Sequence, residues 1–203
     1  MTSTTDGQTY ARRGQKFLGG MRNVLLILGM VTLAYVAYVL LHGRFYQQQA
    51  NDTLDQEIRG GGRSATNFLG RKVKEGDVLG RISIPRIGVT VAILQGTKSK
   101  TLQLGVGHIR GTPLPGEGGN IGIAGHRDTW FRNLKDIHTG DEIQIDTIAG
   151  SSQYKVDWVK IVAPNDLGVL APAGESAITL VTCYPFYYVG PAPERFIVHA
   201  KKL

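Results

Sequence analysis

The distribution of hydrophobic and polar residues divides the chain into an apolar segment, a polar segment and a long region of short alternating runs. The apolar segment, residues 24–41, contains no charged residue. At ~1.5 Å per residue it would form about 27 Å of helix, close to the thickness of the hydrocarbon layer of a membrane. A cleavable signal peptide would have a shorter apolar region followed by a small-residue cleavage site, whereas residues 40–44 read Leu-Leu-His-Gly-Arg. An uncleaved transmembrane helix is therefore predicted.

The polar segment, residues 42–75, follows this helix. Its first part, Phe45 to Ile58, is rich in Gln and carries widely spaced apolar residues. Gly60 to Ser64 then has the composition of a flexible linker. We interpret residues 42–75 as a stalk.

From residue 76 to residue 203 the pattern changes to short apolar or alternating runs separated by Gly, Pro and Asp, which predicts β-strands. Seven runs stand out: Leu79–Ile84, Val89–Leu94, Ile121–Ala124, Glu142–Ile148, Gln153–Ile161, Ala177–Cys183 and Arg195–Ala200. An eighth strand is expected near Gly105–Ile109, and one or two helical turns within Asp128–Ile137. Many short strands with few helical stretches favour a closed β-barrel or a sandwich with one core.

The charges near the N-terminus predict the orientation of the helix. Arg12, Arg13, Lys16 and Arg22 precede the apolar segment against one acid, Asp6. By the positive-inside rule, residues 1–23 form a cytoplasmic tail and the region after the helix lies outside the cell membrane. Residues 1–44 contribute +4 of the formal net charge of +7, so the remaining residues carry only +3. Most of the positive charge thus serves to orient the helix in the membrane, and a nucleic-acid partner is not expected.

The only cysteine of the chain is Cys183, at the end of the run Ala177–Thr182. Exported proteins mostly pair their cysteines in disulfides, so a single thiol suggests a reactive role. Without further information, however, a lone buried cysteine is more often inert than reactive. A neutral thiol also needs a base or a cationic neighbour to become a useful nucleophile.

Among the histidines, His126 has the most informative context. An apolar strand ends in small residues, and His126 opens the polar loop that follows Gly125. Catalytic side chains often project from such strand ends. His108 and His138 adjoin turns and are expected to be structural or exposed, and His199 alternates within the last strand as a core or surface residue would.

Arg195 is the third candidate because it begins the last strand 12 residues after Cys183. If these two strands are neighbours, the guanidinium and the thiol can meet at one rim. A cation there could stabilise a thiolate or a developing oxyanion. The alternative is a surface arginine paired with Glu194.

These residues lie within strings that resemble the sortases, the membrane-anchored cysteine transpeptidases. Thr179-Leu180-Val181-Thr182-Cys183 matches the family's T-L-x-T-C signature. The resemblance extends in the family's order over nearly all of residues 76–203, through the strings Gly80–Pro85, Gly105–Thr112, Asn120–Thr129, Tyr184–Phe186 and Ala192–Phe196. The T-C-Y-P-F and A-P-x-R-F variants are most similar to class D sortases.

The resemblance implies a mainly β fold, a closed sortase-type β-barrel of about eight strands with short helical connections, preceded by one transmembrane helix. It implies Cys183 as the nucleophile, His126 as the general acid and base, and Arg195 as the stabiliser of substrate and oxyanion. The implied substrate is an exported protein with an L-P-x-T-G-like sorting signal near its C-terminus. The implied acceptor is an amine of a cell-wall precursor or a pilin lysine, and no cofactor is implied.

Other interpretations remain open at this point. Water could replace the amine and make the same site a peptidase, or the barrel could bind surface proteins without catalysis. A zinc site lacks the usual Cys and His spacing, no calcium-binding loop sequence occurs, and disulfide exchange usually needs paired cysteines.

Asp128 lies near His126 in the sequence but is left without a role. Pro164–Glu175 could form a wall of the cleft, and the aromatic residues Tyr184, Phe186, Tyr187 and Tyr188 could line a groove or pack in the barrel.

Overall fold

A computed structural model describes residues 6–59, 73–172 and 174–203. The chain divides into two compact units, residues 1–44 and residues 45–203. The predicted linker at Gly60–Ser64 and the first residues of the N-terminal tail lie outside the described residues. Each unit is considered by itself.

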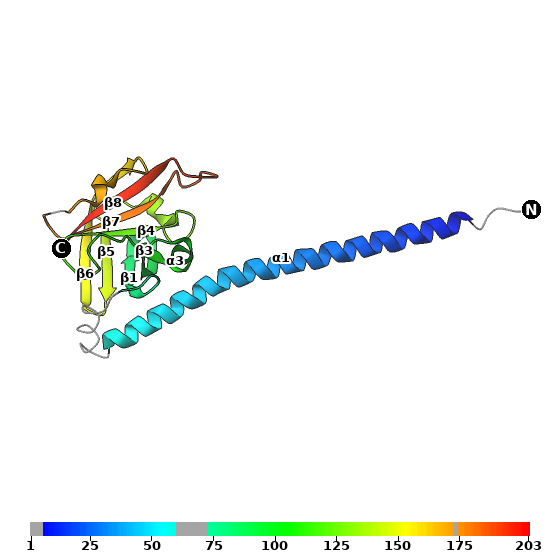
Figure 1. The fold of residues 1–203 in the computed structure, drawn as a ribbon, viewed down its shortest axis with the longest axis horizontal. Coiled ribbons are helices and arrows are strands. Elements are labelled where there is room, and N and C mark those ends of the chain that lie inside the picture. Colours follow the sequence, from blue (N-terminus) through cyan, green and yellow to red (C-terminus); the bar gives the residue numbers. More distant parts are fainter. Residues whose placement is uncertain (1–5, 60–72, 173) are drawn as a thin grey trace, which may run out of the picture. The chain divides into compact units, whose positions relative to one another are not determined.

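The first unit is formed by the helix α1 (Asp6–Arg59), which continues into the second unit. Within it, Gly20–Tyr38 is long and apolar enough to cross a membrane, and its side chains are exposed rather than packed against protein. This candidate span begins and ends a few residues before the segment 24–41 expected from the sequence. Helix α1 is drawn in blue to cyan in Figure 1.

The second unit contains a closed barrel of eight strands, as expected from the sequence (Figure 1). The strands are β1 (Val78–Ile84), β2 (Val89–Gln95), β3 (Val106–His108), β4 (Asn120–Gly125), β5 (Glu142–Thr147), β6 (Gly150–Val162), β7 (Ala177–Tyr184) and β8 (Glu194–Lys202). Their order around the barrel is β1-β2-β3-β4-β7-β8-β6-β5, and β5 pairs with β1 to close it. The eighth strand expected near Gly105–Ile109 is β3.

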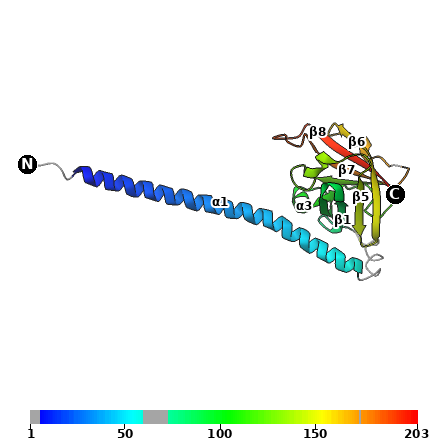
Figure 2. The ribbon, with the colours of Figure 1, turned by 180° about the vertical axis from the view of Figure 1, so that it is seen from behind.

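Two strand pairs are parallel, β2 with β3 and β4 with β7, and the remaining pairs are antiparallel. Parallel neighbours need a crossover connection. The short helix α3 (Ser99–Leu104), which the sequence analysis did not anticipate, supplies the connection between β2 and β3. The hairpin of β5 and β6, the long yellow-green strands of Figure 2, lies in the connection between β4 and β7.

Alternate residues of these strands face a common core. Ile82, Ile121, Ile143, Leu180 and Val198 contribute from five different strands, and all are buried. Three short 3-10 helices, η1 (Pro85–Ile87), η2 (Arg132–Asp136) and η3 (Leu167–Leu170), form connections. Helix η2 falls within the segment Asp128–Ile137, where one or two helical turns were expected.

The polar segment after the apolar helix differs from the expected stalk, because residues 45–59 complete helix α1 within the same compact unit as the barrel. Gln47, Ala50 and Leu54 are buried. Their spacing of three and four residues places them on one face of the helix. Two small or apolar residues and one glutamine make a weak hydrophobic pattern, which explains why this contact was not anticipated.

Candidate functional site

Cys183 lies near the end of β7, between β4 on one side and β8 on the other. In the antiparallel pair of β7 and β8, Cys183 is directly opposite Arg195. Directly opposed residues of antiparallel strands have their side chains on the same face, with Cβ atoms about 4.5–5.5 Å apart. The condition stated from the sequence, that these two strands be neighbours, is therefore met.

His126 follows the last residue of β4 at the same end of the barrel. The parallel pairing of β4 and β7 ends with Gly125 next to Thr182. Thr182 Oγ1 donates a buried hydrogen bond of 2.7 Å to the carbonyl oxygen of Gly125. His126 and Cys183 are the next residues on each strand, so the histidine and the thiol leave two neighbouring strands at one level.

The segment after His126 is held by a buried aromatic ring. Phe131 is fully buried in the core, and its amide donates a 3.0 Å hydrogen bond to the carbonyl oxygen of His126. A Cβ atom on Gly125 would lie 2.5 Å from the Phe131 ring. Glycine is therefore required at this position for close approach, and the small residue before the histidine has a packing reason.

The alternation of the strands places the candidate residues on the outer face of the barrel. Leu180 and Phe196 point into the core, so Cys183 and Arg195, an odd number of residues away on the same strands, point outward. Two residues away along the strands, on the same face, Ala124, Val181 and Ile197 stand side by side in register. These three residues form an apolar row next to the thiol.

Beyond this row, Gly122 of β4 marks a covered part of the outer face. A Cβ atom on Gly122 would lie 3.0 Å from Leu170, 3.1 Å from Thr112 and 3.2 Å from Ile109. Leu170 belongs to η3, within the segment Pro164–Glu175 that was expected to form a wall. The apolar row thus has these side chains on one side and Cys183 on the other.

The guanidinium of Arg195 donates hydrogen bonds to two backbone carbonyls of its own segment, Glu194 at 2.8 Å and Ala192 at 3.2 Å. The contact with Glu194 is therefore to its backbone rather than to its carboxylate. Within residues 73–172 and 174–203, no hydrogen bond links the side chains of Cys183, His126 and Arg195 to one another. Asp128 is exposed and makes no hydrogen bond to His126 in this part of the chain.

The other histidines of the barrel have different surroundings. His108 is buried, with Nδ1 2.8 Å from Gln95 Oε1 and Nε2 2.9 Å from the carbonyl oxygen of Pro113, and burial lowers its pKa. His199 stacks on the ring of Trp158 with the centroids 4.8 Å apart, and burial lowers its pKa as well. His138 contacts the guanidinium of Arg86. None of the three lies beside Cys183 in the strand register.

The sequence analysis overlooked Arg127, whose guanidinium donates to three backbone carbonyls between β7 and β8. Its only sequence signal is its position next to His126.

Among residues 6–59, 73–172 and 174–203, no three His, Cys, Asp or Glu side chains are grouped so as to hold a metal ion. The arrangement brings a thiol, an imidazole and a guanidinium to one rim, and groups of these kinds can carry out acyl transfer.

Comparison with known proteins adds independent information. Residues 82–203 match the family model described as the sortase domain. The chain is 36% identical over 140 residues to sortase D of Bacillus subtilis, which covers 68% of this chain and 71% of that protein.

Two solved structures from Clostridium perfringens share the fold. The sortase D5 transpeptidase has a TM-score of 0.68 and 30% identity, covering 78% of this chain and 98% of the other. A sortase C, solved with the C-terminal cell wall sorting motif, has a TM-score of 0.60 and 28% identity, covering 77% of this chain and 86% of the other.

Proposed function

The chain belongs to the sortase family of cysteine transpeptidases, and from this premise we propose that Cys183, His126 and Arg195 catalyse its transfer reaction. The observation that carries this assignment is the strand register. Cys183 lies opposite Arg195, and His126 follows the last residue of β4 that is paired with β7. One nucleophile, one proton carrier and one cation thus leave three neighbouring strands at the same rim.

The proposed substrate is an exported protein with an L-P-x-T-G-like sorting signal near its C-terminus. The thiolate of Cys183 attacks the carbonyl carbon of the threonine and forms a tetrahedral intermediate. His126, in its protonated form, gives a proton to the leaving glycine amine as the Thr-Gly bond breaks. The products of this half-reaction are a thioester on Cys183 and a released C-terminal fragment.

The second half-reaction transfers the acyl group to an amine. The amine attacks the thioester carbonyl, His126 accepts its proton, and the thiolate of Cys183 leaves. The new amide joins the substrate protein to a cell-wall precursor or to a pilin lysine. If water takes the place of the amine, the same steps give hydrolysis, so a peptidase is the alternative outcome of this chemistry.

Arg195 is proposed to stabilise the negative charge that develops on the carbonyl oxygen. Its guanidinium donates to the carbonyl oxygens of Ala192 and Glu194. A substrate carbonyl entering next to Cys183 offers acceptors of the same kind. A charged donor fixed by the strand opposite the nucleophile costs little reorganisation during the reaction.

Ala124 and Val181 are proposed to receive the leucine and proline of the sorting signal, because they are the partly exposed members of the apolar row, whereas Ile197 is buried. Cys183 lies on one side of the row, and Leu170, Thr112 and Ile109 lie on the other. Apolar side chains of the peptide would displace water from Ala124 and Val181. The sortase C of C. perfringens solved with its C-terminal sorting motif supports recognition of such a peptide by this fold.

The candidate span Gly20–Tyr38 is proposed to anchor the enzyme in the cell membrane. The basic residues before it would keep the N-terminus in the cytoplasm. The barrel would then lie outside the membrane, where exported substrates and cell-wall amines are found.

The test uses intact-mass spectrometry of the full chain in detergent micelles, with L-P-x-T-G peptides and with or without a primary amine. A thioester adduct on Cys183 that the amine converts into an amide product supports the transpeptidase. Adducts that only hydrolyse favour the peptidase. Cys183→Ala and His126→Ala should form no adduct, and a wild-type chain that forms none with a reactive thiol would favour a binding protein.

A further inference from the structure

Arg127 directly follows His126, and its guanidinium reaches the loop between β7 and β8. Nη1 donates a hydrogen bond of 3.0 Å to the carbonyl oxygen of Pro185. Nη2 donates to the carbonyl oxygens of Tyr188 at 2.7 Å and Gly190 at 3.1 Å. The guanidinium carbon also lies 5.9 Å from the centroid of the Tyr188 ring. One side chain of the histidine segment therefore holds three positions of this loop.

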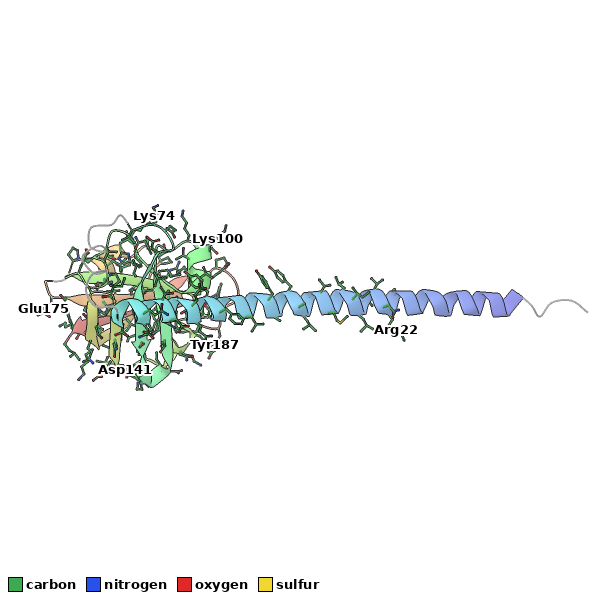
Figure 3. The ribbon with its side chains drawn as sticks, turned by 90° about the horizontal axis from the view of Figure 1, so that it is seen from below. Arg22, Lys74, Lys100, Asp141, Glu175 and Tyr187 are labelled. Atoms are coloured by element: carbon green, nitrogen blue, oxygen red, sulfur yellow. The ribbon has the colours of Figure 1, made fainter. Side chains whose placement is uncertain are left out.

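The loop, residues 185–193, lies between Cys183 and Arg195, and only its start is packed, since Phe186 contacts the core. Val189 is 95% exposed and Tyr187 is 77% exposed at its tip. Glu175, before β7, and Tyr187, after it, lie at opposite sides of the barrel (Figure 3). Beyond Phe186 the loop has few buried contacts, and such a segment opens easily unless other groups hold it.

Other side chains also contact this loop. The Phe186 ring lies 5.2 Å from the Phe196 ring and 6.0 Å from the Tyr184 ring, centroid to centroid. Lys135 Nζ donates to the hydroxyl of Tyr187 at 2.8 Å, which is an exposed contact. Arg195 donates to the carbonyl oxygen of Ala192 at 3.2 Å. Arg127 alone connects both the start and the middle of the loop to the segment that carries the histidine.

The chemistry of arginine suits this task. A guanidinium presents five donors in a rigid plane, so it can bond several carbonyl oxygens that converge on one point. A lysine ammonium keeps the charge but has a different shape and a more flexible stem. Hydrogen bonds from a charged donor are also stronger than those between neutral groups. Replacement by lysine should therefore leave the loop only partly held.

We propose that Arg127 is a positioning residue of the transfer site, which holds the loop 185–193 against the histidine segment in the conformation that receives the substrate peptide. The proposal rests on the sortase reaction proposed above. Because Arg127 is covalently adjacent to His126, the same contacts link the position of the imidazole to that of the loop between the thiol and Arg195. Arg127 acts through the loop and has no chemical role.

The experiment compares the full chain in detergent micelles with Arg127→Lys, Arg127→Ala and the control Arg132→Ala. Arg132 is an exposed arginine of the same segment whose side chain makes no hydrogen bond within residues 73–172 and 174–203. Steady-state transfer of an L-P-x-T-G peptide to an amine gives kcat and KM. Hydrogen exchange measures the amides of residues 186–190 and 192, and alkylation of Cys183 by iodoacetamide reports on the thiol without peptide recognition.

For Arg127→Ala we expect kcat/KM to fall about 10- to 100-fold, mainly through KM, because a loop displaced by about 1 Å is enough for such a loss. Arg127→Lys should fall between Arg127→Ala and the wild type. Exchange in the loop should become faster, while iodoacetamide alkylation and the melting temperature of Arg127→Lys stay close to those of the wild type. Arg132→Ala should match the wild type in every measurement.

The proposal is overturned if Arg127→Lys keeps both wild-type KM and wild-type exchange in the loop. It is also overturned if alkylation slows in parallel with turnover, because the effect would then lie on the thiol rather than on the loop. If Arg127→Ala does not fold, Arg127→Lys decides. If the wild type itself forms no acyl-enzyme, the proposed function fails, and loop exchange alone decides whether Arg127 holds the loop.

Discussion

Cys183 of β7 and Arg195 of β8 are direct partners across an antiparallel pair of strands. Their side chains share the outer face of the barrel because the residues next to them, Thr182 and Phe196, are buried. Residues 185–193, between the ends of the two strands, form the turn of a hairpin. The hairpin thus brings a cation to the thiol without any contact between distant parts of the chain.

Replacement of Arg195 tests the role of this cation. Arg195→Ala should lower kcat for peptide cleavage by about 10²- to 10³-fold, the usual loss when one donor to a developing oxyanion is removed. Arg195→Lys should recover only part of the activity, since an ammonium cannot reproduce the planar donor set. The measurement is steady-state cleavage of a sorting-signal peptide, with iodoacetamide alkylation of Cys183 as the control for an intact thiol. Full activity of Arg195→Ala would contradict the role.

Enlarging Gly125 tests the packing that positions His126. In Gly125→Ala the new methyl group would lie 2.5 Å from the buried Phe131 ring, so the segment after β4 must shift. We expect a loss of about 1–3 kcal/mol in the free energy of unfolding together with a large loss of peptide cleavage. Fluorescence of the two tryptophans, Trp130 and Trp158, both in the barrel, reports the unfolding.

Gly118→Ala is the matched control, because the nearest atom to its Cβ would be Ser176 Oγ at 3.8 Å. This variant should be neutral in both measurements. Equal effects of the two substitutions would mean that close approach to Phe131 is not what requires glycine at position 125.

Thr182 tests the connection between β4 and β7. The buried hydroxyl of Thr182 donates a hydrogen bond of 2.7 Å to the carbonyl oxygen of Gly125. Thr182→Val replaces this hydroxyl with a methyl group of similar size. We expect a loss of about 1–3 kcal/mol from the unpaired carbonyl, measured by denaturant unfolding. Thr182→Ser keeps the hydroxyl and should retain most of the stability and activity. An equally large loss in Thr182→Ser would assign the effect to packing of the methyl group instead.

The pattern of short apolar runs predicted the strands because strand alternation is a local property of the sequence, but it left a barrel and a sandwich open, and the resemblance to the sortases implied the closed barrel. The expectation that Arg195 meets Cys183 was also reachable, since it depends on one hairpin between consecutive strands. The three carbonyls that Arg127 contacts could not be predicted, because they depend on the conformation of the loop 185–193. Gln47 was missed for a similar reason, since its partners Ala92 and Leu104 lie more than 40 residues away in the sequence.

The stability of the barrel should depend on pH through Asp141. The guanidinium of Arg86 donates to both carboxylate oxygens of Asp141, and the amide of His138 donates to Oδ2 at 2.8 Å. The hydrogen bonds from Arg86 are the main cause that lowers the pKa of Asp141. Because the pKa of Asp141 is lower in the folded state, the ionised carboxylate stabilises the fold at pH values above its pKa in the unfolded state, about 3.9. This contribution is lost as the pH falls through the pKa of the folded state.

Asp141→Asn should therefore be less stable than the wild type at pH 7, and the difference should shrink as the pH falls below about 4. The measurement is the melting temperature of the barrel between pH 7 and pH 2, followed by tryptophan fluorescence. Asp52→Asn, an exposed carboxylate on α1, serves as the control and should follow the wild type. A difference that stays constant with pH would mean that Asp141 acts through packing rather than through its charge.

Gln47 connects the helical segment 45–59 to β2 and α3, and therefore bears on where the folded barrel unit begins. The strand β3 starts opposite Ile93, so the edge of β2 at Ala92 lies beyond it. Gln47 fills this place: its Oε1 accepts from the amide of Ala92 at 2.8 Å, and its Nε2 donates to the carbonyl oxygen of Leu104. A buried side-chain amide thus satisfies one backbone group at the edge of β2 and one at the end of α3.

Gln47→Leu should lower the free energy of unfolding of the barrel by about 1–3 kcal/mol for each backbone group left buried without a partner. The neighbouring Gln48→Leu changes an exposed residue in the same way and should be close to neutral, so the pair separates the hydrogen bonds from a general effect on the helix. A chain that begins at residue 76 lacks Gln47 altogether and should melt below one that begins at residue 45. Equal melting temperatures for these two chains would show that residues 45–75 do not stabilise the barrel. A lower melting temperature of the shorter chain would show that the helical segment 45–59 belongs to the folded barrel unit and stabilises it through Gln47.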